Sequence, residues 1–279
     1  MPNQGVISDI ERSLNFADQL LATDPIYLIV NPMISKRVEI MKTLNRNYVA
    51  HEYVNRNWEP MAFSKMAAWL ASSKLSFACS AEYLDHIDQV NITNIQKNFL
   101  NEIPESTFRE TVRDFVVNQQ FRKDYWIKGG IKSNALDKIE FLRKQKIMLT
   151  KNDKLFDFKV KTSMGEIIVQ ESVYRPLLDL ISDYRPYTLG QLEKSLKSTN
   201  LTLMQLTNAM LLFGASGVIS PVQDEDQIVR AKPQTDKLNN YIIKRARGSD
   251  DVAYLASPVT GGGISVDRFQ QLFIFYYGV

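Results

Sequence analysis

Residues 60–70 read PMAFSKMAAWL, and this stretch decides the fold expected for the first half of the chain. Its apolar residues recur at the spacing i, i+3, i+4 and i+7 of one helix face, at positions 63, 66, 67 and 70. Positions 108, 112, 115 and 116 repeat much the same spacing. The first 128 residues contain a single glycine, so strands joined by tight glycine turns are not expected there. The sequence therefore predicts a helical domain over residues 1–145.

A second domain, α+β and similar to a winged helix, is expected over residues 146–279. The runs KIMLT, FDFKVKT and GEIIVQ are prone to form strands, with turns expected at Asn152–Asp153 and around Gly165. Three helical patterns follow, over residues 174–181, 188–196 and 202–213. VISPV and QIVRA flank the acidic residues 224–226 and predict a hairpin, which would complete the winged helix. A strand in VAYLASPV, three glycines and an amphipathic helix end the chain.

Three of the expected helices begin with a capping box, in which a threonine and a glutamine three residues later satisfy each other's backbone N–H groups. The pairs are Thr93 with Gln96, Thr188 with Gln191, and Thr202 with Gln205.

Composition indicates an ordinary folded protein. The 279 residues carry a formal charge of only +3, which does not by itself indicate a nucleic-acid or membrane partner. The N-terminus shows no signal peptide, and the apolar run 26–30 is much shorter than the ~20 residues of a membrane span. Cys79 is the single cysteine, which excludes an internal disulfide. We therefore expect a soluble, cytoplasmic protein that binds no membrane.

The usual catalytic signatures are missing from the sequence. His51 and His86 are the two histidines, and neither lies in an H-E-x-x-H zinc motif. Cys79, in apolar SFACSA beside a helical pattern, fits a small core residue better than a nucleophile. The glycines at 261–263 lack the G-x-G-x-x-G pattern and the following βαβ unit of a nucleotide site. A glycine turn that folds the last helix back onto the sheet is the favoured interpretation.

A winged-helix protein that binds nucleic acid is the alternative hypothesis. Residues 198–229 contain no lysine or arginine, although cationic side chains on phosphates supply most of the non-specific affinity for DNA. The main prediction is therefore a protein that binds no nucleic acid.

Residues 48–60, YVAHEYVNRNWEP, are unusually rich in polar and large amphipathic side chains. Such a mixture is typical of a protein contact, but also of an internal polar network between helices, and composition does not separate the two. We expect one contact surface in this segment, formed by Tyr48, His51, Glu52, Tyr53, Trp58 and Glu59. A second contact surface is expected at Arg113, Arg122, Lys123, Asp124 and Tyr125.

Several long motifs carry a resemblance to a known family. YVAHEYVNRNWEPMAFSKMAAWLASSKLSFACSAEYLD (48–85) and ETVRDFVVNQQFRKDYWIKG (110–129) resemble the methyltransferase regulatory domain of bacterial S-adenosylmethionine-dependent methyltransferases. VYRPLLDLI (173–181), YTLGQLEKSL (187–196) and YLASPVTGGGISVDRFQQLF (254–273) resemble the C-terminal domain of the same proteins, which include protein lysine methyltransferases. The resemblance extends from about residue 40 to the end of the sequence.

The resemblance implies a regulatory and substrate-recognition portion of a protein methyltransferase. In that family a Rossmann-like domain binds S-adenosylmethionine, and no such glycine loop is found in the early part of this sequence. We therefore expect either a fragment of a longer enzyme or a separately encoded accessory part, without catalytic activity alone. No cofactor is expected in this chain, and S-adenosylmethionine is expected in the associated catalytic domain. The expected partners are that catalytic domain, in cis or in trans, and a protein substrate.

Overall fold

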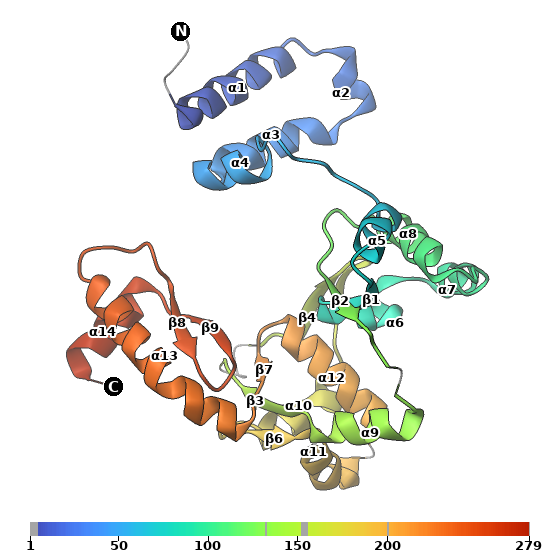
Figure 1. Ribbon diagram of the computed structural model, residues 1–279, viewed down its shortest axis with the longest axis vertical. Coiled ribbons are helices and arrows are strands. Elements are labelled where there is room, and N and C mark those ends of the chain that lie inside the picture. The colour runs from blue at the N-terminus through green and yellow to red at the C-terminus, as the bar shows by residue number, and fades with distance from the viewer. Residues whose placement is uncertain (1–4, 132, 152–155, 200, 279) are drawn as a thin grey trace. The chain divides into compact units, whose positions relative to one another are not determined.

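The computed structural model describes residues 5–131, 133–151, 156–199 and 201–278. Figure 1 shows a mainly α-helical chain with small antiparallel sheets. The chain divides into two compact units, Met1–Ala62 and Phe63–Val279. Over the described residues, no helix is long and apolar enough to span a lipid bilayer.

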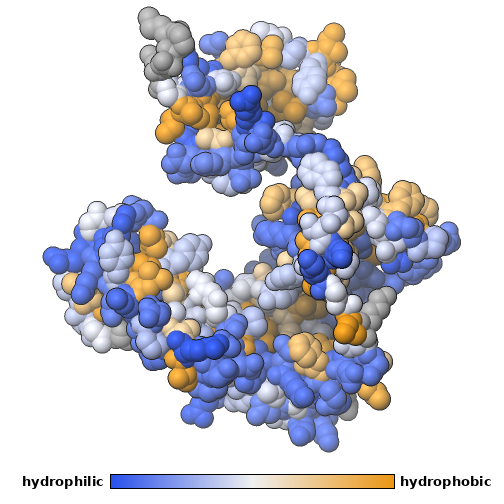
Figure 2. All heavy atoms as spheres, viewed as in Figure 1, coloured by the Kyte–Doolittle hydropathy of each residue, from blue (hydrophilic) through white to orange (hydrophobic). Residues whose placement is uncertain are grey.

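The first unit is a small group of helices: α1 (Val6–Leu21), α2 (Ile26–Val30), α3 (Met33–Thr43) and α4 (Arg46–Glu52). Its buried residues are Ile10, Leu14 and Val49. Arg46 fastens the unit, because its guanidinium pairs with Glu11 and donates to the carbonyls at the end of α3. The apolar helix α2 has no buried residue, and its side chains are visible in orange on the surface in Figure 2.

The second unit begins with helices and one pair of strands. Its first elements are α5 (Phe63–Ala71), β1 (Leu75–Ser80), the 3-10 helix η1 (Tyr83–His86), α6 (Asp88–Asn91), α7 (Asn94–Asn101), α8 (Ser106–Val116), β2 (Asp124–Lys128) and α9 (Ala135–Lys144). The helices around residues 63–70 and 108–116 are confirmed. In α8, however, the residues of the apolar pattern are not buried, and Phe115 is 82% exposed.

The strands β1 and β2 were not expected in a helical domain. Cys79 lies in β1, which follows α5 in the chain, and it is half-buried. The strand pair was not predicted, because the prediction considered only strands joined by a tight glycine turn. β1 instead pairs antiparallel with β2, and the helices η1 to α8 connect the two strands.

Two small sheets follow in the chain. β3 (Lys146–Leu149) is the central strand of an antiparallel sheet with β6 (Tyr187–Thr188) and β7 (Ile219–Pro221). β4 (Lys159–Thr162) and β5 (Gly165–Ile168) form a separate hairpin with the expected turn before Gly165. The turn expected at residues 152–153 lies outside the described residues.

The three helices predicted after these strands are present as α10 (Glu171–Leu180), α11 (Leu189–Ser195) and α12 (Leu203–Ala215), with the short 3-10 helix η3 (Lys197–Thr199) between the last two. The capping boxes of α7, α11 and α12 are all formed.

The hairpin predicted around residues 224–226 is wrong. Residues 225–245 form the long helix α13 (Glu225–Arg245), and the acidic residues occupy its N-terminal turn. The positive end of the helix dipole favours carboxylates at this position, so the acidic run marks a helix start and not a turn between strands. The neighbour of β7 is β3, and the wing expected from VISPV and QIVRA is not formed.

The glycines at 261–263 join two strands. β8 (Tyr254–Ser257) and β9 (Gly262–Ser265) form an antiparallel hairpin, and Gly261 has a left-handed φ of 73° in its turn. α14 (Arg268–Tyr277) starts only after this hairpin, with a capping box between Asp267 and Gln270. The glycines therefore serve a turn and a strand, and they do not form a loop between a strand and a helix.

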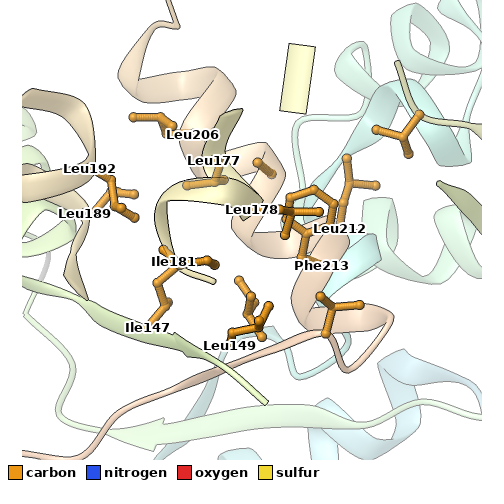
Figure 3. Packing of buried hydrophobic residues seen from close by; sticks show 14 of the residues in the cluster. Ile147, Leu149, Leu177, Leu178, Ile181, Leu189, Leu192, Leu206, Leu212 and Phe213 are labelled. Atoms are coloured by element: carbon orange, nitrogen blue, oxygen red, sulfur yellow. The ribbon is translucent and has the colours of Figure 1, made fainter. Parts of the chain in front are cut away.

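The main core of the second unit lies among β3, β7, α10, α11 and α12 (Figure 3). Phe213 is fully buried there, and the rings of Phe156, Phe158 and Tyr174 surround it at centroid distances of 5.4, 6.4 and 6.1 Å. Ile87 of the earlier helices belongs to the same core. The domain boundary expected at residues 145/146 stays a prediction.

Candidate functional site

The first expected contact surface lies at the end of the first unit. The side chain of Asn45 accepts hydrogen bonds from the backbone N–H groups of Asn47 and Tyr48 and so starts α4. Val49 is the fully buried residue of this helix. The six candidate residues are all exposed, Trp58 by 56%. Their contact role stays a prediction.

Two tyrosine side chains of this surface lie close together. The rings of Tyr48 and Tyr53 meet edge to face, with centroids 6.4 Å apart. Exposed Tyr and Trp side chains are typical of protein contacts, since their rings are rigid and one edge is polar. The exposure favours a contact surface over the internal network that composition also allowed.

The second expected surface divides into a buried and an exposed part. Arg122 and Asp124 bind each other and are mostly buried, with side chains 17% and 9% exposed. Arg113 donates to the backbone carbonyl of Asp85 at 3.1 Å, and Lys123 pairs with Glu82 at 2.8 Å. Tyr125 is exposed. The contact role predicted for these five residues is untested, and they lie in a different unit from the first surface.

Arg122 is the centre of a charged cluster that joins β2 to α8. Its Nε and one Nη donate to both oxygens of Asp124, at 2.9 and 3.0 Å. The other Nη donates to Asp114 at 2.6 Å, and a further bond reaches Glu110 at 3.1 Å. Four of the five N–H donors of a guanidinium are thus used inside the protein.

Three aromatic rings lie beside this guanidinium. Phe77 and Trp126 are register partners in β1 and β2, and Phe63 at the start of α5 stacks on Trp126 with a centroid distance of 5.5 Å. The guanidinium carbon of Arg122 lies 4.3 Å from the centre of the Phe63 ring and 5.4 Å from that of Phe77. Such cation–π contacts are strongest where water is excluded.

Burial and charge in the cluster shift two pKa values. Burial alone would lower the pKa of the Arg122 guanidinium, but its hydrogen bond to Asp124 and the charges of Asp114 and Asp124 raise it. Burial raises the pKa of the Asp114 carboxyl, because the nearby guanidinium offsets only part of that effect. Arg122 therefore stays protonated, and the cluster holds one positive charge against three carboxyl groups.

The arrangement is suited to holding structure together. The guanidinium occupies the space in front of the ring faces, so another cation cannot take its place there. Among the described residues, no group of histidine, cysteine or acidic side chains is arranged to hold a metal ion. The cluster fastens α5, α8, β1 and β2 to each other.

Sequence reasoning missed most of this cluster. Arg122 and Asp124 were selected, but Phe63, Phe77, Glu110, Asp114 and Trp126 were not assigned to them. The available signal was the alternation in Asp124–Lys128, which places Tyr125 and Trp126 on opposite faces of a strand.

Comparison with known proteins finds a family profile that matches this region. Residues 45–128, which include both expected surfaces and the cluster, match the profile of a predicted methyltransferase regulatory domain. An uncharacterized protein of Synechocystis sp., sll1526, is 34% identical over 272 residues, which are 98% of this chain and 54% of that protein.

Two solved structures share the fold. PKMT2 from Rickettsia typhi in complex with AdoHcy is similar with a TM-score of 0.59 and 11% identity, over 98% of this chain and 57% of that chain. Another structure of PKMT2 gives a TM-score of 0.56 and 12% identity, over 96% and 57%. The chain thus spans little more than half the length of these proteins.

Replacing the exposed Trp58 should not affect stability, in contrast to the packed Trp126. We expect Trp58→Ala to change the free energy of unfolding by less than about 0.5 kcal/mol, and Trp126→Ala to lower it by about 2–4 kcal/mol. Urea denaturation followed by circular dichroism measures both. A loss of similar size in Trp58→Ala would mean that residues 48–60 form an internal network.

Arg122→Lys should destabilise the second unit although it keeps the charge. A lysine provides neither the two parallel bonds to Asp124 nor a planar group over Phe63, so we expect a loss of about 2–3 kcal/mol in the free energy of unfolding. The exposed neighbour provides the matched control, since Lys123→Arg should leave the urea midpoint unchanged. Equal midpoints for wild type and Arg122→Lys would contradict the role given to the cluster.

The raised pKa of Asp114 predicts a pH dependence. Between the pKa of this carboxyl in the unfolded chain and its higher pKa in the folded chain, the folded chain binds more protons. The contribution of Asp114 to the free energy of unfolding therefore falls as the pH rises through this range. The asparagine of Asp114→Asn cannot ionise. The free energy of unfolding of this variant relative to that of wild type should therefore increase from pH 3.5 to pH 7. Unfolding free energies of both proteins across that pH range measure the difference, and a difference independent of pH would contradict the assignment.

On these comparisons, residues 45–128 match the profile of a predicted methyltransferase regulatory domain, and the chain has a fold similar to that of a large part of PKMT2.

Proposed function

We propose that this chain is the regulatory and substrate-recognition portion of an S-adenosylmethionine-dependent protein lysine methyltransferase, and that it transfers no methyl group alone. The observation that carries the proposal is the match of residues 45–128 to a regulatory domain, together with a fold similar to that of PKMT2. PKMT2 was solved with AdoHcy, which is what remains of the methyl donor after transfer.

The extent of the matches supports a division of labour. The chain covers 54% of the Synechocystis protein and 57% of PKMT2, so each contains a large part without a counterpart in the matched region. In our proposal the methyl donor binds in that other part. The strands described in this chain support this, because they pair antiparallel in sheets of two or three strands. A Rossmann-like cofactor domain instead has a parallel sheet and binds its ligand at the carboxyl ends of the strands.

The expected contact residues receive roles in positioning a partner. The exposed Tyr48, Tyr53 and Trp58 would contact the catalytic domain or the protein substrate. Tyr125 is exposed on β2, the strand that Arg122 joins to α8. It would be the most rigidly held residue of the second surface. None of these residues is assigned a proton transfer.

The proposal includes a winged-helix-like arrangement without the predicted wing. α10, β6, α11, α12 and β7 follow each other in the order expected of a winged helix, and β3 takes the central place in the sheet. We assign this unit to protein contacts, because residues 198–229 contain no lysine or arginine that would neutralise phosphate groups. We also propose a cytoplasmic location, because a single cysteine fits a reducing compartment.

Calorimetric titration with S-adenosylmethionine tests the proposal directly. We expect no binding to this chain at up to ~1 mM ligand, since the sheets described here do not form the cradle that the methyl donor needs. Full-length PKMT2, which was solved with AdoHcy, is the positive control and should bind S-adenosylmethionine. Micromolar binding to the lone chain, or transfer of a radiolabelled methyl group to a protein by the lone chain, would disprove the non-catalytic role.

A further inference from the structure

The two outer edges of the β8–β9 hairpin differ in their hydrogen bonding. On the β8 side, the side-chain amide of Asn239 in α13 accepts a hydrogen bond from the N–H of Ala256 at 2.7 Å and donates to its carbonyl at 2.8 Å. This amide therefore occupies the position that a neighbouring strand would take. The β8 edge is closed at this point.

The edge of β9 is open. Ala256 is the register partner of Gly263, and its N–H and C=O point away from β9, toward Asn239. In an antiparallel pair, facing residues point their backbone groups in opposite directions when they are not bonded to each other. Gly263, and Ser265 two residues later, therefore direct their N–H and C=O groups outward from the hairpin. Among the described residues, these groups have no hydrogen-bond partner.

The open edge leads into an apolar groove. A groove of about 330 Å³ begins at Ser265 and Val266, at the end of β9, and continues along α14. Its other lining residues are Phe269, Gln270, Phe273 and Ile274, so no charged side chain lines it. Phe269 is 78% exposed and Phe273 is 52% exposed. Large apolar surface of this kind is typical of a binding site.

We propose that β9 binds an extended polypeptide segment as an added strand, with a large apolar side chain of that segment in the α14 groove. The open N–H and C=O groups of Gly263 and Ser265 require a partner that offers the same groups in an extended row, which a peptide backbone does. The glycines of β9 leave no side chains to block its approach. The uncharged groove favours leucine, valine or phenylalanine over lysine. This inference goes beyond the proposed function and does not depend on it.

The probe is a fluorescein-labelled peptide, acetyl-Lys-Thr-Leu-Thr-Val-Thr-Lys-amide, titrated with the full 279-residue chain by fluorescence anisotropy. Its leucine and valine lie on one face of an extended strand. Saturable binding below ~1 mM is expected, and its absence would overturn the proposal. Two further versions, N-methylated at alternate amides, distinguish main-chain pairing from apolar adsorption. At least one should bind about tenfold more weakly, and equal binding of all three peptides would also overturn it.

A matched pair of variants tests the protein side. Gly263→Pro removes the outward N–H of β9, whereas Gly263→Ala keeps it and places its Cβ at an ordinary 3.6 Å from Tyr254. We expect about tenfold weaker peptide binding for the proline variant only. Phe273→Ser should weaken binding to a similar degree, and Tyr276→Ser, on the same helix but outside the groove, should not.

Thermal unfolding of each variant establishes that the hairpin remains folded. If Gly263→Pro does not fold, the N-methylated peptides with the wild-type chain decide the question. Equal affinities of folded Gly263→Pro and Gly263→Ala would overturn the proposal.

Discussion

The guanidinium of Arg122 holds α5, α8, β1 and β2 together. A two-stranded sheet such as β1–β2 has little stability of its own in water. Here it is joined to α8 through Asp114 and Glu110, and to the start of α5 through the ring of Phe63. Four N–H groups of the guanidinium donate hydrogen bonds, and its face packs on aromatic rings. These contacts fix the position of the strands relative to the helices. The exposed residues between them, such as Tyr125, are consequently held in place.

This arrangement has a chemical consequence for the proposed function. Proteins commonly bind a cationic ligand in front of aromatic rings, but here the cation is a side chain of the protein itself. The ring faces of Phe63 and Phe77 are therefore occupied by Arg122 and are not open to a cationic ligand. The three carboxyl groups share one protonated partner, and the side chains of Glu110 and Asp114 remain 23% and 18% exposed.

The C-terminal part of the chain presents the opposite situation. At the β8–β9 hairpin, one edge is satisfied by Asn239, whereas the other exposes two backbone positions beside an apolar groove. Backbone groups and apolar side chains in one place are the requirements for recognising an extended peptide. An open edge of this kind agrees with the proposed role in recognising a protein.

Local features of the sequence were sufficient to predict the helices and their starts. A capping box is formed by residues three positions apart, and a helical face by residues three and four apart, so Thr93, Thr188 and Thr202 marked α7, α11 and α12 without knowledge of the rest of the chain. The acidic run at 224–226 was ambiguous at this level, because both a turn and a helix N-terminus favour such residues. The tertiary structure alone decided that it begins α13, and that Arg122 meets Phe63 and Phe77. These contacts join residues about 45 to 59 positions apart in the chain, and only folding brings their side chains close enough for charge and ring faces to interact.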